Sequence, residues 1–166
     1  MSRVLYIVAS AAPPVERISA LVTAAQRRGW DTCLILTPSA AGWLTDDVAG
    51  LAALTGHPVR SAYKKPGDPD VLPPADAMAV VPATFTTINK WAAGISDTLA
   101  LGLINEAIGM SIPIVTVPVV NDALARHPAL AASLATLRGA GVIVLKLGTG
   151  PEPGVFPWEQ VLDALG

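Results

Sequence analysis

The sequence predicts an α/β fold, a single Rossmann-like, three-layer αβα sandwich around a six-stranded parallel sheet. Short apolar runs alternate along the chain with longer segments of helical periodicity, as parallel strands alternate with their crossover helices. Several runs are apolar throughout, as expected of strands that are covered by helices on both faces. At 166 residues the chain is predicted to form one domain, 1–166.

The expected strands are the apolar runs, and the third of them is the weakest candidate. They lie at 4–9, 32–36, 58–63, 77–81, 112–117 and 142–147. A polar, proline-rich loop at 64–74 separates the third from the fourth.

Five helices are expected between and after these strands, at 14–28, 42–54, 87–110, 123–138 and 158–165. The first has Pro13 and Pro14 in or before its first turn and ends at Gly29, which suits the preferences of both residue types. Gly56 ends the second.

The predicted topology places a ligand site beyond the carboxyl ends of the first and fourth strands, where the winding of the common order 3-2-1-4-5-6 reverses. The first strand ends in Ser10, Ala11 and Ala12, small residues that let a ligand approach the backbone. This loop lacks the GxGxxG pattern, so an ordinary strand-to-helix connection is the alternative. The fourth strand leads into a hydroxyl-rich loop at the start of a helix, 82–87, which is a suitable anion site.

A family resemblance centres on that loop. Residues 82–97, Pro-Ala-Thr-Phe-Thr-Thr-Ile-Asn-Lys-Trp-Ala-Ala-Gly-Ile-Ser-Asp, are similar to the P-A-[ST]-A-N-T-x-x-K-x-A-x-G-x-x-D motif of the homo-oligomeric flavin-containing cysteine decarboxylases. Residues 118–121, Pro-Val-Val-Asn, resemble the P-A-M-N motif of that family, and 37–40, Thr-Pro-Ser-Ala, resemble its T-x-S-A turn. His127 and Pro128 also match the family pattern. The likeness spans roughly residues 3–147.

The resemblance implies that FMN is the cofactor. The residues expected to hold it are Ser10, Ala11, Ala12, Thr37, Ser39, Pro82, Ala83, Thr84, Thr86, Thr87 and Lys90. In this family the flavin oxidises a substrate thiol to a thioaldehyde, which promotes loss of CO2. The resemblance therefore implies an oxidoreductase- or lyase-type reaction on a small or peptidyl thiol carboxylate.

Two residues are the candidates for catalysis. Asn121 is expected to hold a substrate carboxylate or a flavin edge, with a plain helix N-cap as the alternative. Asp68 stands where the family has a catalytic histidine, and it would accept a proton only if burial raised its pKa. The neighbouring Gly67 and Pro69 favour an exposed turn instead.

Further departures from the family pattern keep a second function open. Thr86 replaces an asparagine and Val120 a methionine, and the glycine- and proline-rich segment 148–154 replaces a substrate flap that carries a cysteine. These differences put standard decarboxylation in doubt. The alternative is a non-catalytic, FMN-binding regulatory or partner subunit of the same fold, and a binder of another nucleotide is a third hypothesis.

Several candidate side chains also have an ordinary structural interpretation. Thr87 can simply cap the next helix, and Lys90 can be a solvated helix charge. His127 precedes a proline and is expected to be structural. Trp43 and Trp91 could stack on a flavin but are more typical of core or subunit interface.

Composition predicts a homo-oligomer, and the family resemblance implies a trimer or a multiple of trimers. Hydrophobic residues make up 52% of the chain and charged residues only 14%, against roughly 25% in typical soluble domains. A net charge of −2 argues against nucleic acid, and no apolar run approaches the ~20 residues of a membrane span. With no signal peptide expected after the first Met, the cytoplasm is the predicted location. Cys33, the single cysteine, excludes a disulfide within the chain and is expected to be buried; no metal site is expected.

Overall fold

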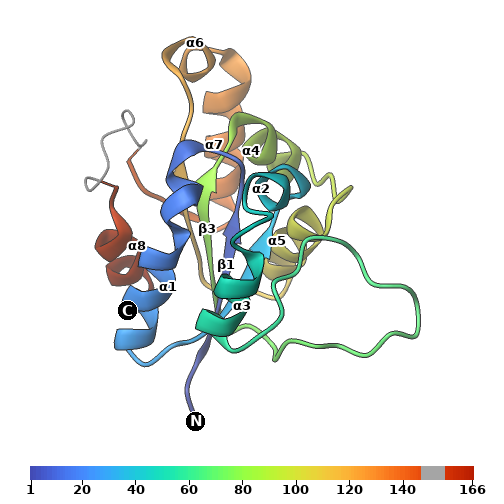
Figure 1. Ribbon diagram of the computed structural model, residues 1–166. Helices are drawn as coiled ribbons and strands as arrows, with labels where there is room; N and C mark the ends of the chain where they lie inside the picture. The colour runs from blue at the N-terminus through green and yellow to red at the C-terminus, as the bar shows by residue number, and fades with distance from the viewer. Residues whose placement is uncertain (147–155) are drawn as a thin grey trace.

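The computed structural model describes residues 1–146 and 156–166, and its centre is a parallel sheet (Figure 1). Within these described residues the sheet has five strands in the order β2-β1-β3-β4-β5. The strands are β1 (Val4–Ala9), β2 (Asp31–Leu36), β3 (Ala77–Ala83), β4 (Ile114–Pro118) and β5 (Ile143–Val144). The predicted α/β class with a parallel sheet is confirmed, but the predicted count of six strands is wrong.

The expected strand at 58–63 is reduced to a single bridge beside β2. Leu36 N donates to Arg60 O over 2.8 Å, and Arg60 N donates to Leu34 O over 3.1 Å. Pro58 has no N–H to offer the ladder. Beyond the bridge, the Arg60 guanidinium donates through Nη2 to Ala62 O over 3.0 Å, and the chain turns away from the sheet. One residue pair is therefore all that remains of this strand.

Several helices expected to be continuous are divided. The helices are α1 (Ile18–Arg27), α2 (Pro38–Trp43), α3 (Val48–Thr55), α4 (Phe85–Ala92), α5 (Leu99–Gly109), α6 (Asp122–Ala125), α7 (Pro128–Gly139) and α8 (Trp158–Leu165), with a 3-10 turn, η1 (Pro13–Arg17), before α1. Gly94, with a φ of 74°, ends the segment after α4, because the left-handed region cannot continue a helix. Pro128 separates α6 from α7, since the residue before a proline is disfavoured in helical geometry.

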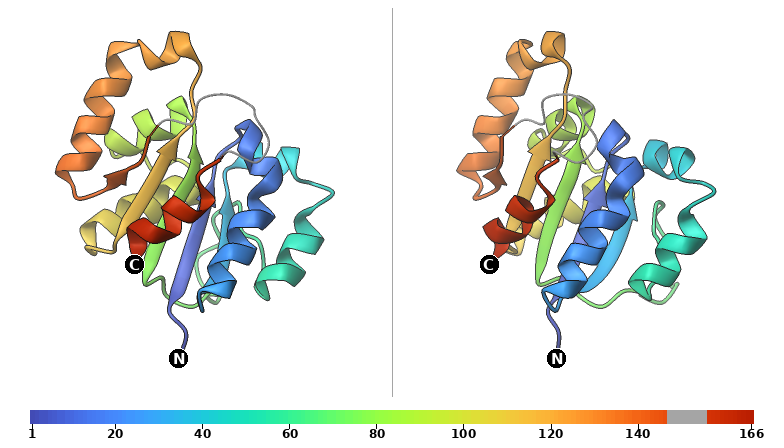
Figure 2. Two further views of the ribbon diagram at one scale, coloured as in Figure 1. Left: turned by 90° about the vertical axis from the view of Figure 1, so that its left-hand side faces the viewer. Right: turned by 60° about the vertical axis from the view of Figure 1, so that its left-hand side comes forward.

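Helices cover both faces of the sheet, so the core has two halves (Figure 2). Along β1, Leu5, Ile7 and Ala9 contribute to one half, where buried side chains of α1, α3 and α8 gather. Tyr6 and Val8 contribute to the other half, with α4, α5 and α7. The continuous apolar pattern of β1 is explained by this double cover.

Cys33 lies in the second half of the core and is fully buried, as expected. Burial raises the pKa of its thiol to about 12, with a smaller contribution from the charge of Asp31. The side chain therefore acts as a small core residue rather than as a reactive thiolate.

A long loop, residues 61–76, projects sideways from the body before β3 (Figure 1). Near the C-terminal end of this loop, shortly before β3, Pro73 O accepts from Tyr6 Oη over 2.6 Å. Val4 N then donates to the Asp76 carboxylate over 2.7 Å, next to the start of β1. These bonds fasten the loop to the amino-end edge of the sheet.

No helix in the described ranges is long and apolar enough to cross a membrane.

Candidate functional site

Three hydroxyl groups meet where β1 and β3 end. Ser10 Oγ donates to Thr87 Oγ1 over 3.0 Å, and Thr84 Oγ1 donates to the same atom over 3.2 Å. Ser10 N donates to Pro82 O over 2.9 Å, which ties the two loops together. Ser10 and Thr87 are buried, with 2% and 6% of their surface exposed. Because Thr87 Oγ1 accepts two hydrogen bonds here, its own hydroxyl proton remains available to a ligand.

The hydroxyl cluster of Ser10, Thr84 and Thr87 sits at the N-terminus of α4. Thr84 is the N-cap, and its Oγ1 accepts from Thr87 N over 3.3 Å. The N–H groups of Phe85 and Thr86 belong to the first turn, which has no acceptor within the helix. Free N–H groups, the positive end of the helix dipole and clustered hydroxyls together favour a bound anion such as a phosphate.

The neighbouring loops after β1 and β2 present small residues and another hydroxyl. Ala12 is buried and Ala11 half-buried just before η1, so little side-chain volume obstructs this side of the cluster. Thr37 N donates to Ala9 O over 3.0 Å, which places the start of α2 beside the end of β1. Thr37 Oγ1 caps α2 by accepting from Ala40 N over 3.2 Å. Ser39 is exposed on the first turn of α2.

Asn121 lies in the loop after β4, on the other side of the cluster. Val119 N donates to Ala83 O over 2.9 Å, so this loop begins against the end of β3. Asn121 Oδ1 accepts from Leu124 N over 2.9 Å and caps α6. The cap fixes the side-chain oxygen and leaves the exposed NH2 group with its donors for a ligand. The capping role and the ligand role are therefore compatible.

Asp68 lies apart from these residues, in the exposed loop 61–76. Its carboxylate accepts from Lys65 N over 3.0 Å, and its carbonyl accepts from Lys64 Nζ over 2.9 Å. Figure 1 shows this loop projecting away from the edge where β3 ends and α6 lies. Within one chain, the structure does not bring Asp68 to the hydroxyl cluster.

The remaining candidates have local partners. Lys90 Nζ contacts the Asp97 carboxylate at 2.7 Å, which links α4 to the connection before α5. Trp91 is buried and its Nε1 donates to Ile104 O over 3.3 Å, so it is a core residue. Trp43 is 54% exposed at the end of α2. The segment 148–154 lies outside the described residues.

Sequence reasoning missed a contact between Phe85 and His127. The two rings meet edge to face, with centroids 5.4 Å apart and planes at 77°. Phe85 stands where the family motif has an alanine, and that substitution was the available signal. The contact joins the loop after β3 to the loop that carries Asn121.

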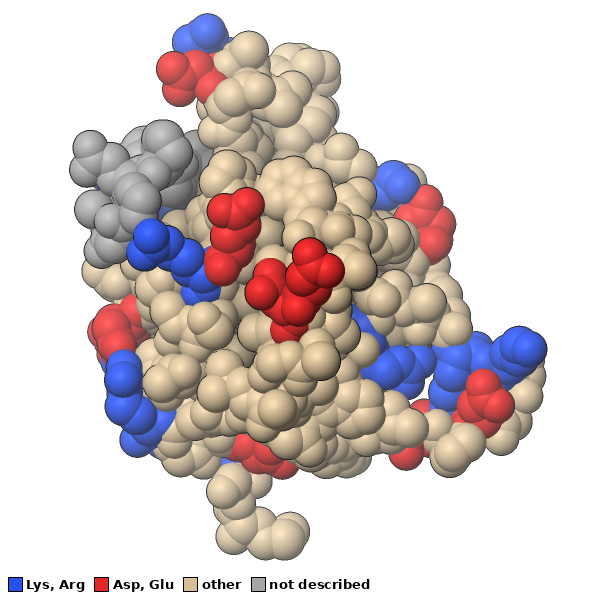
Figure 3. Space-filling model, viewed as in Figure 1, with Lys and Arg blue, Asp and Glu red and all other residues tan. Residues whose placement is uncertain are grey.

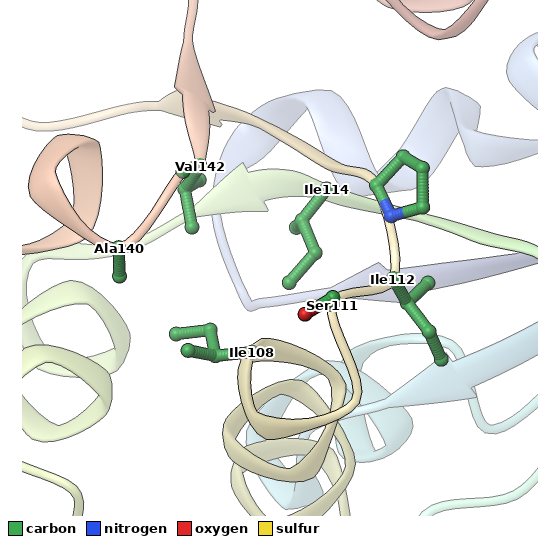
Figure 4. Close-up of a pocket in the computed structure, with 8 residues that line it drawn as sticks. Ile108, Ser111, Ile112, Ile114, Ala140 and Val142 are labelled. Carbon is green, nitrogen blue, oxygen red and sulfur yellow. The ribbon is translucent and has the colours of Figure 1, made fainter.

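A pocket of about 200 Å³ lies at the opposite edge of the sheet (Figure 4). Its lining is Ile108, Ser111, Ile112, Pro113, Ile114, Ala140, Gly141 and Val142. These residues surround the amino end of β4 and include no charged side chain. Because this lining offers no titratable side chain for the predicted chemistry, the hydroxyl cluster stays the candidate site.

Charge is sparse on the molecule. Most of the face in Figure 3 carries no charged residue, and acidic and basic groups are interspersed on it without a broad basic surface. Within residues 1–146 and 156–166, no group of three His, Cys, Asp or Glu side chains could hold a metal ion.

The comparison with known families gives the class of protein for this α/β fold, a flavoprotein. The model of the Flavoprotein family matches residues 2–165, so the chain belongs to that family. No curated protein sequence matches the chain.

Solved structures with the same fold include several cysteine decarboxylases. The FMN-dependent cysteine decarboxylase SpaF has a TM-score of 0.77 at 20% identity, covering 100% of this chain and 98% of its own. The peptidyl-cysteine decarboxylase EpiD has a TM-score of 0.70 at 22% identity, with 99% of each chain covered. AnUbiX (PadA1), in complex with FMN and dimethylallyl pyrophosphate, has a TM-score of 0.74 at 15% identity, covering 100% of this chain and 89% of its own. The predicted resemblance to the flavin-containing cysteine decarboxylases is confirmed, and the family supports FMN as the cofactor.

Proposed function

We propose that this chain binds FMN and uses flavin redox chemistry on a small or peptidyl substrate that carries a thiol and a carboxylate. The observation that carries the proposal is the hydroxyl cluster at the N-terminus of α4, in which Ser10 and Thr87 are buried and Thr84 is half-buried. Family membership supports it, as do cysteine decarboxylases among the neighbours in fold.

The residues present fit the phosphate end of FMN. The Thr87 hydroxyl proton and the first N–H groups of α4 would donate to phosphate oxygens, with Ser10 and Thr84 holding Thr87 in place. The small side chains of Ala11 and Ala12 leave room beside them. Thr37, Ser39, Pro82, Ala83, Thr86 and Lys90 complete the proposed set, with Lys90 contributing through its ion pair with Asp97.

FMN, when bound, supplies a two-electron acceptor for thiol oxidation. The chain must then hold the substrate and remove the thiol proton. Asn121 is proposed to hold the substrate carboxylate through its NH2 group, because its oxygen is engaged by Leu124 N. Asp68 is the proposed proton acceptor that stands in place of the family's histidine, and in a homo-oligomer its projecting loop could serve a neighbouring copy.

The homo-oligomer, a trimer or a multiple of trimers, is part of the proposal. It would cover large apolar side chains that a single chain exposes, among them Trp43, Val71 and Ile95 at 54%, 44% and 43% exposure. Light scattering of the purified protein gives the mass directly. A monomer at micromolar concentration would contradict this part of the proposal.

Anaerobic mixing of the FMN-loaded protein with a peptide that ends in cysteine tests the reaction, with loss of flavin absorbance as the readout. Asn121→Asp keeps an N-cap oxygen for α6 but replaces the NH2 donor by a second oxygen, whereas Asn121→Ala removes both. We expect Asn121→Asp to lower the affinity for the peptide about tenfold or more, with a helix content like that of the native chain. A native protein whose FMN no thiol carboxylate reduces would refute the enzymatic proposal.

That outcome would favour the alternative, a non-catalytic FMN-binding regulatory or partner subunit. The observation in its favour is that Asp68 is bound to Lys64 and Lys65 within its own exposed loop, apart from the site.

A further inference from the structure

Two contacts fasten the loop that carries Asn121 to the loop that begins α4. We call residues 119–127 the Asn121 loop and residues 82–87 the α4 entry loop. At the base, Val119 N donates to Ala83 O over 2.9 Å. At the far end, the ring of His127 meets the ring of Phe85, centroid to centroid at 5.4 Å. Asn121 lies between these two contacts, so its position depends on both.

The His127 ring is itself held by a hydrogen bond. Its Nδ1 accepts from Ala129 N over 3.0 Å and so caps α7. With Nδ1 as an acceptor, a neutral ring carries its proton on Nε2. The cap fixes the ring's orientation, and the fixed ring presents itself to Phe85. Although His127 is exposed, it therefore has one preferred position rather than several.

A contact between the two helices that follow these loops provides a comparison. Ser133 Oγ donates to Asn89 Oδ1 over 2.7 Å, and so joins α7 to α4 further along both helices. This bond stabilises the packing of α4 on α7 but lies outside the Asn121 loop. Removing this bond should therefore affect the stability of the protein without affecting the position of Asn121.

We propose that His127 and Phe85 are positioning residues that hold the Asn121 loop against the α4 entry loop. The part of this inference that concerns substrate rests on the proposed function, and the part that concerns the loop does not. Phe85 stands at the alanine position of the family motif, so the contact belongs to this chain's own sequence.

Two substitutions of His127 separate its roles. His127→Asn keeps an N-cap acceptor for Ala129 N and removes the ring, whereas His127→Phe keeps an aromatic ring and removes the acceptor. Phe85→Leu removes the other ring, and Phe85→Tyr retains one. Ser133→Ala is the matched control, because it deletes one contact of the same interface outside the loop.

Hydrogen exchange of the protein without added FMN measures the loop directly. The reporters are the amides of Leu124, Ala125 and Arg126, whose bonds close α6 onto Asn121 and Ala123. We expect exchange about two- to tenfold faster in His127→Asn and Phe85→Leu, the size of an edge-to-face aromatic contact. Phe85→Tyr and Ser133→Ala should match the native rates at these amides. Native rates in both His127→Asn and Phe85→Leu would overturn the proposal.

A second measurement connects the contact to the substrate. In the FMN-loaded protein, Phe85→Leu and His127→Asn should raise KM for a cysteine-terminated peptide severalfold, while kcat changes less. The reason is that both substitutions displace Asn121, which is proposed to bind the substrate carboxylate, and leave the flavin in place. An unchanged KM together with faster exchange would overturn the substrate part alone. A native protein that reduces no FMN would refute the proposed function and leave the exchange result to decide the loop.

Discussion

The two ends of the parallel strands, which we call the carboxyl edge and the amino edge of the sheet, differ in the chemistry of their side chains. At the carboxyl edge, Ser10, Thr84 and Thr87 form a largely buried polar cluster at the N-terminus of α4. At the amino edge lies a pocket of about 200 Å³, which is lined mainly by apolar side chains such as Ile108 and Ile112. The carboxyl edge therefore carries polar, anion-binding groups, whereas the pocket at the amino edge is lined by no charged side chain.

The volume of the pocket therefore does not by itself make the amino edge the candidate site. In a parallel sheet, the free N–H groups of the following helices all face the carboxyl edge, so anion binding is confined to that edge. The amino edge receives helix C-termini and is free to be apolar. Changes at the two edges should therefore have separable effects, on FMN binding at one and on stability at the other.

The largest effect is expected at the carboxyl edge, from Thr87→Val. The substitution keeps the shape of the side chain and removes the hydroxyl that the cluster presents to phosphate. FMN affinity should fall about 10- to 100-fold, the range for a hydrogen bond to a charged group. A fluorescence titration with FMN measures it.

Thr116→Val is the matched control for Thr87→Val. Thr116 is equally buried, but its Oγ1 donates to Val80 O over 2.8 Å inside the sheet. The Thr116→Val variant should be less stable than the native chain but should bind FMN with native affinity. Equal FMN affinity in Thr87→Val and the native chain would contradict the assignment of the cluster.

The next effect concerns stability at high pH. Burial, with smaller contributions from the charges of Cys33 and Asp70, raises the pKa of Tyr6 to about 12. In the unfolded chain tyrosine titrates near 10, so the contribution of Tyr6 is fully present below pH ~10 and is lost as pH rises toward 12. The loss should reach about 2 kcal/mol.

Tyr6→Phe removes this titration. Its unfolding free energy should be about 1 kcal/mol lower at neutral pH, because the bond to Pro73 O is gone, and should then fall less steeply than the native value above pH ~10. Urea unfolding at a series of pH values measures both curves. Parallel curves from pH 9 to 12 would rule out a shifted tyrosine.

A smaller effect is expected where the loop 61–76 meets α5. A Cβ added at Gly102 would lie 2.1 Å from Tyr63 Oη, and Tyr63 Oη donates to Ser96 O over 2.9 Å. In a Tyr63→Ala background, Gly102→Ala should stabilise the protein by about 1 kcal/mol through helix propensity. In the native background the displaced tyrosine should cancel most of that gain. Additive effects in the double-mutant cycle would show that the two residues do not touch in solution.

The smallest effect is expected at the lining of the apolar pocket. Ser111 has a φ of 57°, which favours glycine, so Ser111→Gly should raise the unfolding free energy by about 0.5–1 kcal/mol. Ser19→Gly, at an exposed site in α1, should instead lower it by a similar amount. Neither variant should alter FMN affinity, and a changed affinity in Ser111→Gly would place the amino edge in the site.

Local sequence patterns correctly predicted the helices and strands that depend little on the rest of the chain. β1 was predicted at its exact bounds because an unbroken apolar run fits only a doubly covered strand, and α8 was equally well defined. The prediction of a strand at 58–63 was wrong because hydrogen bonding to β2 depends on that neighbouring strand and on the path that the chain takes after residue 60. The breaks at Gly94 and Pro128 were visible as residue types, but helical periodicity on both sides concealed them.

The hydroxyl cluster was predictable because topology alone brings the ends of β1 and β3 together. For Asp68 the sequence left two interpretations open, a proton acceptor at the site and an exposed turn, since the path of a long loop is not encoded by its periodicity. The contact of Phe85 with His127 could not be predicted from local patterns, because it joins residues far apart in the chain. Whether the proposed residues hold FMN stays a prediction.

The central claim is that the hydroxyl cluster at the start of α4 holds the phosphate of FMN. The most direct test is a titration of the flavin-free protein with FMN and, separately, with riboflavin, which lacks the phosphate. We expect FMN to bind at least tenfold more tightly than riboflavin and Thr87→Val to remove most of this difference. Equal affinity for the two flavins, or binding of neither, would contradict it.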